Sequence, residues 1–215
     1  MESKKWYIIT VFINKTQSFT HNLYNKKYFE ITFCMCYNFA MENKEYKVDL
    51  QNLDVEKLKT LSPGELTDMG VCPTCFDRAT NHALYGDNSL LLTYEDEDIE
   101  CLFVPNPRAQ GHMMISTQTH YHDLSEAPDY INEKIIRFAK AYMKIIKQVY
   151  DCERVYLCTM SDGPMNHYHI QLLPRYKTEK RGSTNFVKPR QQYIFDKQKF
   201  DKVCELITQY AKSQK

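Results

Sequence analysis

A long amphipathic helix between two groups of short β-like segments is the feature that most constrains the fold of this chain. Over residues 128–150, large apolar residues recur at steps of four and three, so they share one helical face. These residues are Ile131, Ile135, Phe138, Tyr142, Ile145 and Val149. Pro128 suits the first turn, where a missing N–H loses no intrahelical hydrogen bond. A single apolar face of this length requires another layer to cover it.

Five segments with β-strand character flank the helix and supply that layer. They are residues 89–94, 99–104 and 112–117 before it, and residues 155–159 and 167–173 after it. The first two flank the acidic turn 95–98 and predict a hairpin. Apolar residues at helical spacing over 200–210 predict a C-terminal helix. Because the links are short, the sequence predicts an α+β domain with an antiparallel sheet of about five strands, a long helix packed on it and a C-terminal helix.

The overall composition excludes several classes of protein. The chain has 215 residues, with 28 Lys and Arg against 27 Asp and Glu, and its hydrophobic content of 43% is typical of a globular protein. A net charge of +1 gives no general attraction to nucleic acid or to an anionic membrane, so we expect neither as a partner. No apolar run approaches the ~20 residues that a membrane-spanning helix requires.

Residues 1–40 form an atypical N-terminal extension that is rich in aromatic residues and contains no Gly, Pro, Asp or Arg. A signal peptide is one interpretation, with two lysines before the short apolar run 6–13, but no cleavage site follows. A β-rich extension is the second. We favour a third, in which an over-long gene model has included upstream codons and Met41 begins the ordinary sequence. The extension therefore takes no part in the functional argument.

Alternating nitrogen-bearing side chains mark the segment 167–173. On a strand, His167, His169 and Gln171 share one face, and the apolar residues between them share the other. Successive members lie about 7 Å apart along the strand. The face is either a site lined by nitrogen atoms or a solvated polar surface that happens to hold two His, and the spacing alone leaves both interpretations open.

Two of the eight cysteines form a Cys-x-x-Cys pair, Cys72-Pro-Thr-Cys75. This spacing forms a turn that lets two thiolates reach one zinc ion. A redox dithiol is the alternative, but such a pair usually follows a strand in a βαβ unit, and here the strands come later. A purely structural or chance pair is the third interpretation. Since no export signal is recognised, we expect no disulfide framework and a cytoplasmic location.

A zinc site needs two further ligands, and five of the seven His lie in two short windows. The first window contains His112, His120 and His122, and the second contains His167 and His169. One His from each window would complete a Cys₂His₂ ligand set.

In this combination the sequence resembles the histidine-triad (HIT) superfamily of nucleotidyl hydrolases and transferases. The resemblance covers residues 72–176 and rests on the Cys-x-x-Cys pair, the hairpin, residues 107–115, His120, the long helix and the segment 167–171. The family's strand motif usually has a third His, where this chain has Gln171. The His-x-His-x-Gln pattern is similar to the branch that contains galactose-1-phosphate uridylyltransferase and some dinucleoside-polyphosphate phosphorylases, although this chain has the size of a single-motif protein.

The resemblance implies catalytic roles for two residues. His169 matches the nucleophile that attacks the α-phosphorus and forms a nucleotidyl-histidine intermediate, and a neutral imidazole is competent for this near pH 7. Gln171 matches the residue that hydrogen-bonds the transferring phosphoryl group. An amide cannot protonate a leaving group, so weakly basic leaving groups such as phosphate or pyrophosphate suit this chain best. Within the strand, the second ring nitrogen of His169 can donate to a backbone carbonyl, which would aim the other nitrogen outward.

The resemblance also implies a structural zinc ion held by Cys72, Cys75, His120 and His167, with His122 as the alternative to His120. Four protein ligands leave no open coordination position, which is the mark of a structural site rather than a catalytic one. In this interpretation zinc ties the Cys-x-x-Cys turn to the active strand.

Further substrate contacts are expected around the active strand. The family's acidic ribose-binding residue on the second strand falls at Val104 here, and Asn106 is the nearest polar substitute. Ser161 and Asn166, in the turn before the active strand, could face phosphate. His112 is expected on a strand, where it orients a neighbour or packs.

The remaining segments flank the predicted catalytic domain 72–176. Residues 41–71 read as a connector with one short helix around 55–61 and a turn over 61–65. Residues 177–215 form a basic loop and the C-terminal helix. Basic residues after the active strand, among them Arg175, Lys188 and Arg190, could pair with distal phosphates of a substrate. A solvated loop or a dimer contact is the alternative.

The sequence therefore predicts a nucleotidyl hydrolase or transferase that acts on a nucleoside phosphate derivative, such as a dinucleoside polyphosphate. The resemblance implies that it works as a homodimer. The alternative is a zinc-stabilised protein that binds nucleotides without turning them over.

Overall fold

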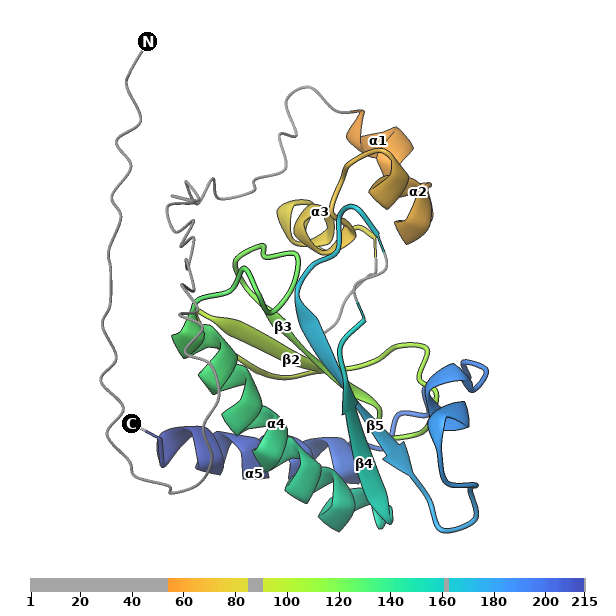
Figure 1. Ribbon diagram of the computed structural model, residues 1–215, viewed down its shortest axis with the longest axis vertical. Helices are drawn as coiled ribbons and strands as arrows, with labels where there is room; N and C mark the ends of the chain where they lie inside the picture. Colours follow the sequence, from red (N-terminus) through yellow and green to blue (C-terminus); the bar gives the residue numbers. More distant parts are fainter. Residues whose placement is uncertain (1–53, 85–90, 161–162, 215) are drawn as a thin grey trace, which may run out of the picture. The chain divides into compact units, whose positions relative to one another are not determined.

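The computed structural model describes residues 54–84, 91–160 and 163–214, so the extension 1–40 and residues 41–53 of the connector lie outside the described residues. A five-stranded antiparallel sheet forms the centre, with strand order β1-β2-β3-β5-β4. The strands are β1 (Leu92–Glu95), β2 (Ile99–Phe103), β3 (Met113–Thr117), β4 (Arg154–Cys158) and β5 (His169–Arg175). Helices α4 (Asp129–Tyr150) and α5 (Lys197–Lys212) pack on one face of this sheet (Figure 1). The predicted α+β fold is confirmed.

Cross-strand register divides the sheet into a covered face and an open face. On the covered face, Cys101, Ile115 and Ile170 are neighbours on β2, β3 and β5, and all three belong to the main apolar core beneath α4 and α5. Because side chains alternate along a strand, the residues between them point to the open face. One cross-strand row on that open face consists of Glu100, Ser116 and His169.

Strand β5 continues through Pro174 to Arg175, so the prediction that this strand ends at residue 173 is wrong. The carbonyl of Arg175 accepts the N–H of Glu153 at 2.9 Å, so the polar groups of Arg175 point toward β4. The nitrogen of Pro174 points to the other side, because polar groups alternate along an antiparallel strand. On that side β3 has already ended, since its last pair with β5 joins Met113 to Leu172. The missing N–H therefore removes no ladder hydrogen bond.

Three short helices precede the sheet and form a unit that we call the cap: α1 (Val55–Leu58), α2 (Pro63–Asp68) and α3 (Pro73–Ala79). The prediction of a turn over 61–65 is wrong. Ser62 accepts the N–H of Glu65, and the Glu65 carboxylate accepts the N–H of Ser62, so the two residues form a capping box at the start of α2. The cap has an apolar core of its own, made of Leu58, Leu66, Val71 and Phe76.

The C-terminal loop contains one short 3₁₀ helix, η2 (Ser183–Val187), before α5. Among the described residues, no helix has both the length and the apolar content to cross a membrane.

Candidate functional site

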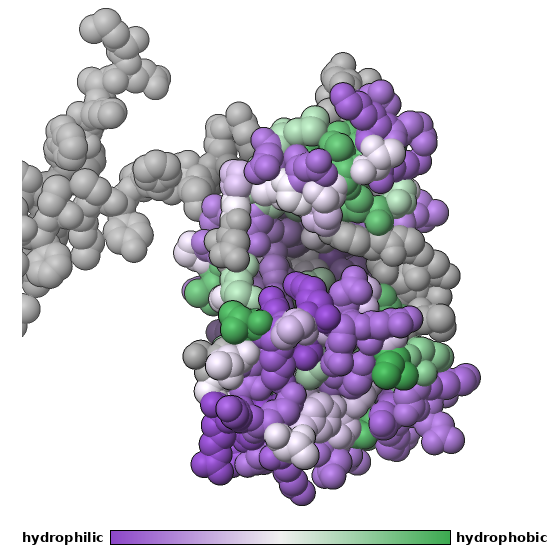
Figure 2. All heavy atoms as spheres, turned by 90° about the vertical axis from the view of Figure 1, so that its right-hand side faces the viewer, coloured by the Kyte–Doolittle hydropathy of each residue, from purple (hydrophilic) through white to green (hydrophobic). Residues whose placement is uncertain are grey.

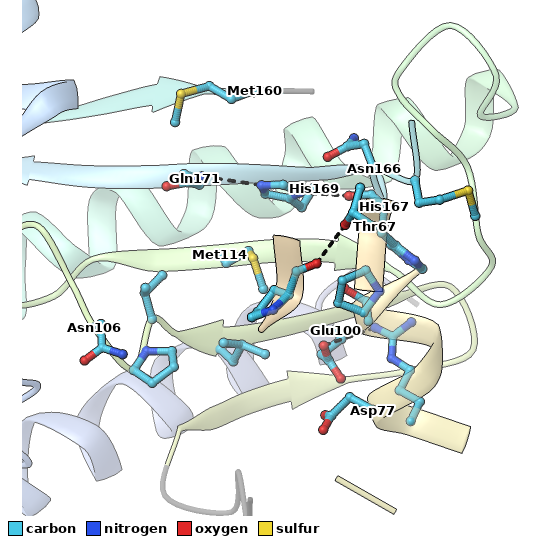
Figure 3. A pocket seen from close by; sticks show the side chains of 18 of the residues that line it. Thr67, Asp77, Glu100, Asn106, Met114, Met160, Asn166, His167, His169 and Gln171 are labelled. Atoms are coloured by element: carbon cyan, nitrogen blue, oxygen red, sulfur yellow. Dashed lines mark hydrogen bonds and ion pairs between the residues drawn. The ribbon is translucent and has the colours of Figure 1, made fainter. Parts of the chain in front are cut away.

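A pocket lies between the cap and the open face of the sheet. The sheet contributes His169 and Gln171 from β5, and the side chains of Met114 and Leu102 from β3 and β2. The cap contributes residues of α2 and α3, and loop residues Asn106 and Asn166 complete the wall (Figure 3). In the space-filling view the cap lies at the top, and a recess separates it from the largely hydrophilic surface below (Figure 2).

His169 is held in one tautomer at the centre of this pocket. Its Nδ1–H donates to the carbonyl of His167 at 2.7 Å, so Nε2 carries the ring's lone pair. The side-chain nitrogen of Gln171 lies 3.4 Å from this Nε2. Burial lowers the pKa of His169 below its ordinary value, so the ring is neutral near pH 7. A neutral, oriented imidazole with its lone pair in a pocket is arranged to act as a nucleophile.

A further hydrogen-bonded pair fixes the amide of Gln171. The backbone N–H of Arg108 donates to Nδ1 of His112 at 3.2 Å, which leaves the proton of this ring on Nε2. That Nε2–H donates to Oε1 of Gln171 at 3.1 Å. Because the amide oxygen is occupied, the amide N–H₂ group faces His169. His112 directly precedes β3, and it orients a neighbouring side chain as expected.

Four sulfur and nitrogen atoms converge where the cap meets the sheet. They belong to Cys72, Cys75, His120 and His167, and all lie within 4.8 Å of one another. Cys72 caps the N-terminus of α3 and Cys75 lies in its first turn, while His167 directly precedes the active strand. Since His167 is not yet in the strand, its ring is free to turn toward the cap. The structure brings together the four residues that the sequence predicted as metal ligands.

The spacing of these atoms fits a tetrahedral zinc ion. Nδ1 of His167 lies 3.5 Å from Sγ of Cys72 and 3.4 Å from Sγ of Cys75, and Nδ1 of His120 lies 3.5 Å from Sγ of Cys75. Zn–S bonds of about 2.3 Å and Zn–N bonds of about 2.05 Å at tetrahedral angles separate sulfur from nitrogen by about 3.6 Å. Nε2–H of His167 donates to the carbonyl of Thr117 at 2.8 Å, which leaves Nδ1 deprotonated, as a ligand must be.

The two thiols are also prepared for metal binding. A hydrogen bond from the Cys75 thiol lowers the pKa of Cys72, while the adjacent Cys72 sulfur and burial raise the pKa of Cys75. The pair therefore readily holds one thiolate, and a cation between the sulfurs would favour the second. Thiolate sulfur and neutral imidazole are the donors that zinc prefers.

Residues 86–178 of this chain match a family model described as the HIT domain. The chain contains a HIT domain. An uncharacterized HIT-like protein of Methanocaldococcus jannaschii is 26% identical over 95 residues, which span 43% of this chain and 74% of that protein. The predicted resemblance to the HIT superfamily is thus confirmed.

Two solved structures also match part of the chain. A zinc-bound histidine triad family protein from Mycobacterium smegmatis gives a TM-score of 0.45 at 15% identity, over 57% of this chain and 86% of that one. The diadenosine triphosphate hydrolase of Plasmodium falciparum, solved with cyclomarin A, gives 0.43 at 10% identity, over 60% of this chain and 82% of that one.

The structure distinguishes between His120 and His122, the two alternative metal ligands that the sequence left open. His120 contributes an atom to the Cys/His cluster, whereas Nδ1 of His122 lies 3.0 Å from a carboxylate oxygen of Glu126. The ring centroids of His120 and His122 lie only 5.0 Å apart. Both rings therefore lie near the cluster, and their positions in the sequence could not show which of them is the ligand. The geometry favours His120 as the ligand.

Of the three predicted substrate contacts, Asn106 and Asn166 are among the described residues, and both line the pocket. Asn106 is exposed at one end of the pocket, and its carbonyl accepts a hydrogen bond from Arg190. Asn166 lines the pocket near His169, and its amide donates to the carbonyl of His122 (Figure 3). Ser161 lies outside the described residues, so its role stays a prediction.

Three charged pocket residues were missed by the sequence argument. Glu100 lies on the open face of β2, where the alternation of that strand could have revealed it. Arg78 of α3 bonds Glu100 at 3.0 Å, and no sequence pattern pointed to it because its partners are distant in the chain. Asp77 of α3 also lines the pocket, and one of its carboxylate oxygens lies 2.9 Å from Nδ1 of His82.

Proposed function

We propose that this HIT protein is a nucleotidyl hydrolase or transferase that forms a covalent intermediate on His169. The observation that carries the proposal is the orientation of the His169 ring. Its Nδ1–H is committed to the carbonyl of His167, and the lone pair of Nε2 is directed into the pocket. Its substrate is a nucleoside phosphate derivative, such as a dinucleoside polyphosphate.

In the first step, the Nε2 lone pair of His169 attacks the α-phosphorus and forms an N–P bond. The bond from phosphorus to the leaving-group oxygen breaks, and the leaving group departs with that electron pair. The positive charge on the ring is stabilised by the carbonyl of His167, which accepts a hydrogen bond from Nδ1–H. Water, or a second acceptor in a transferase, then attacks the phosphorus. The electron pair of the N–P bond returns to Nε2, the proton of the attacking group passes to the solvent, and the ring is neutral again.

Gln171 serves this step as a hydrogen-bond donor. Its amide group already faces His169, because His112 occupies the amide oxygen. A small rotation would direct an amide N–H to a phosphoryl oxygen, where charge develops in the transition state. Since the amide has no acidic proton to give, weakly basic leaving groups such as phosphate are the favoured substrates.

Cys72, Cys75, His120 and His167 would hold a zinc ion that ties the cap to the active strand. Such an ion has a structural role, because four protein ligands leave no position for a reacting water. His167 therefore supports the pocket, and His169 performs the chemistry. The homodimer and the cytoplasmic location stay predictions, as does the absence of a nucleic-acid partner.

Trapping the intermediate tests the proposal. The protein is mixed with a radiolabelled dinucleoside polyphosphate, quenched, and assayed for acid-labile, base-stable label on the chain. We expect label on the wild type and on His122→Ala, a control that changes an exposed His outside the cluster. His169→Ala should carry no label but keep its zinc and melting temperature, whereas His167→Ala should lose zinc as well as activity.

Each contrary result has a definite meaning. Substrate binding without label or turnover would establish the alternative, a zinc-stabilised nucleotide-binding protein. Zinc loss in His169→Ala, with zinc retained in His167→Ala, would show that ligand and nucleophile have been exchanged in the assignment. Gln171→Ala should still form the intermediate but about 10²–10³-fold more slowly, the effect expected for one transition-state hydrogen bond.

A further inference from the structure

One cation lines the pocket without a carboxylate partner. Arg78 bonds the carboxylate of Glu100 at 3.0 Å, and one carboxylate oxygen of Asp77 lies 2.9 Å from Nδ1 of His82. Arg190 lines the same pocket, but among the described residues no carboxylate forms an ion pair with it. Arg190 is therefore the cation of the described pocket wall whose charge no carboxylate balances.

Two other basic residues of this region have carboxylate partners. Arg175 is buried at the end of β5 and bonds the carboxylate of Glu153 at 2.9 Å. Lys188 forms an ion pair with Glu179. Both carboxylates lie outside the pocket lining, so of these three cations Arg190 is the one that presents its charge to the pocket.

Several hydrogen bonds hold the segment around Arg190 against the loop between β2 and β3. The guanidinium of Arg190 donates to the carbonyl of Asn106 at 2.9 Å, and the N–H of Gln191 donates to the carbonyl of Pro107 at 2.8 Å. The guanidinium of Arg108 donates to the carbonyl of Lys188. The chain is therefore held in place both before and after Arg190. The guanidinium uses one N–H in its bond to Asn106, so most of its five N–H donors stay available for a ligand.

A second cation, Arg108, lies near Arg190. Burial lowers the pKa of Arg190, and so does the positive charge of Arg108. Neither arginine forms an ion pair with a described carboxylate, so the two like charges repel each other at the pocket edge. A bound anion would relieve this repulsion, and the guanidinium fork matches the oxygens of a phosphate.

The anion would sit beyond the reacting phosphorus. Along the chain His167 precedes β5, and His169 and Gln171 follow within it; Asn106 lies toward the Gln171 end of the pocket in Figure 3. Because Arg190 bonds Asn106, it also belongs to that end, past the amide that contacts the phosphoryl group.

We propose that Arg190, supported by Arg108, forms an anion subsite for a phosphate of the substrate other than the one that His169 attacks. The inference rests on the proposed function, which determines how the substrate extends from the phosphorus that His169 attacks. Such a phosphate belongs either to the polyphosphate chain or to the ribose, and both would present the same oxygens to the guanidinium. In either case the subsite selects substrates with more than one phosphate over simple nucleoside monophosphate derivatives.

Binding measurements test the subsite without requiring turnover. Dissociation constants are measured by calorimetry for AMP, ATP, adenosine 3′,5′-bisphosphate and inorganic tripolyphosphate. We expect Arg190→Gln to weaken at least one of the multiply phosphorylated ligands by about tenfold, the loss of one charge-assisted hydrogen bond, while AMP changes by less than about twofold. Arg190→Lys should keep part of the affinity, because it retains the charge but loses the fork.

Arg181→Gln is the matched control, since it removes the same charge from an exposed position of the same loop. A loss confined to ATP and tripolyphosphate supports a site for the polyphosphate chain, and a loss confined to the 3′,5′-bisphosphate supports a site for a ribose phosphate. Equal losses for AMP and ATP, equal effects of Arg181→Gln, or no binding of any probe would overturn the subsite. The proposed function fails separately, through the absence of labelled His169.

Discussion

At the residue scale, a continuous series of hydrogen bonds runs from the backbone N–H of Arg108 to the ring of His169. The N–H of Arg108 fixes the tautomer of His112, and His112 fixes the amide of Gln171. Gln171 then presents its nitrogen to His169. Without His112 the amide oxygen and nitrogen of Gln171 could exchange places, and the oxygen would repel a phosphoryl group. His112 is thus a positioning residue for the proposed reaction.

The burial of His112 predicts a pH-dependent stability. Burial lowers the pKa of His112 to about 4, and the positive charges of Arg108 and Arg190 act in the same direction. Between the ordinary pKa of about 6.5 and this value, the unfolded chain binds the proton and the folded chain does not, so stability falls as the pH falls. From pH 7 to pH 4.5 this residue should remove about 2 kcal/mol of the free energy of unfolding.

Urea unfolding of zinc-loaded wild type and His112→Gln at these two pH values measures the effect. The variant is less stable at pH 7 but should lose about 2 kcal/mol less than the wild type on acidification. Effects of acid on the zinc ligands are common to both proteins and cancel in the comparison. His122→Gln, which changes an exposed His, should follow the wild type. Identical losses in wild type and His112→Gln would contradict the prediction.

At the scale of elements, α3 is attached to the sheet in two independent ways. One is the Cys/His cluster at its N-terminus. The other is Arg78 in its last turn, which donates to the carbonyls of Thr117 and Gln118 at 2.9 and 3.1 Å, and to Ser116 and Glu100 at 3.1 and 3.0 Å. A seven-residue helix is too short to be stable alone, so these attachments determine where it lies.

Substitution of Arg78 by Lys should loosen this attachment while the metal stays bound. A lysine ammonium cannot reproduce the guanidinium fork, so some of the buried acceptors lose their partner. We expect a loss of about 1–3 kcal/mol in the free energy of unfolding, with one zinc ion per chain retained. Urea denaturation and metal analysis give both quantities. Arg154→Lys, on the exposed side of β4, is the control, and an equal effect there would refute the role of Arg78.

At the scale of the whole described chain, the Cys/His cluster lies between two apolar cores. The main core lies between the sheet, α4 and α5, and the smaller one lies within the cap. Two of the cluster residues, Cys72 and Cys75, belong to the cap, and the other two, His120 and His167, belong to the loops of the sheet domain. The pocket lies across the same junction, so its shape depends on how firmly the cap is held.

Removing the metal should therefore loosen the cap before the sheet. After treatment with a chelator, we expect amide hydrogen exchange over 54–80 to accelerate by at least about tenfold, because metal binding contributes folding free energy to the cap. Exchange in α4 and the central strands should change little, since their core contains no metal ligand. Cys72→Ser should reproduce the pattern without a chelator. Uniform acceleration through both cores, or none in the cap, would show that the cluster does not join them.

Much of the fold follows from patterns that are local in the sequence. The apolar steps over 128–150 predicted α4 to within one residue of its start, and the β-like runs 99–104 and 112–117 predicted β2 and β3 to within one residue at each end. Such patterns need only the geometry of a helix or a strand. The same holds for the shared face of His169 and Gln171, which follows from alternation alone.

Other features depend on residues that meet only after folding. The sequence could not separate His120 from His122, because which ring reaches Cys75 depends on the path of a loop. Neither could it foresee that Pro174 continues β5, since this depends on where the neighbouring strand ends.

The clearest contrast lies between two features of the site. The sequence by itself determined the chemical types of the residues: a Cys-x-x-Cys pair and a His-x-His-x-Gln strand, whose spacing is set by covalent geometry. Only the tertiary structure decided which basic residue lines the pocket, placing Arg190 there while Arg175 and Lys188 found carboxylates elsewhere. A charge acts on whatever lies within a few ångströms, and that neighbourhood is fixed by packing between distant segments rather than by position along the chain.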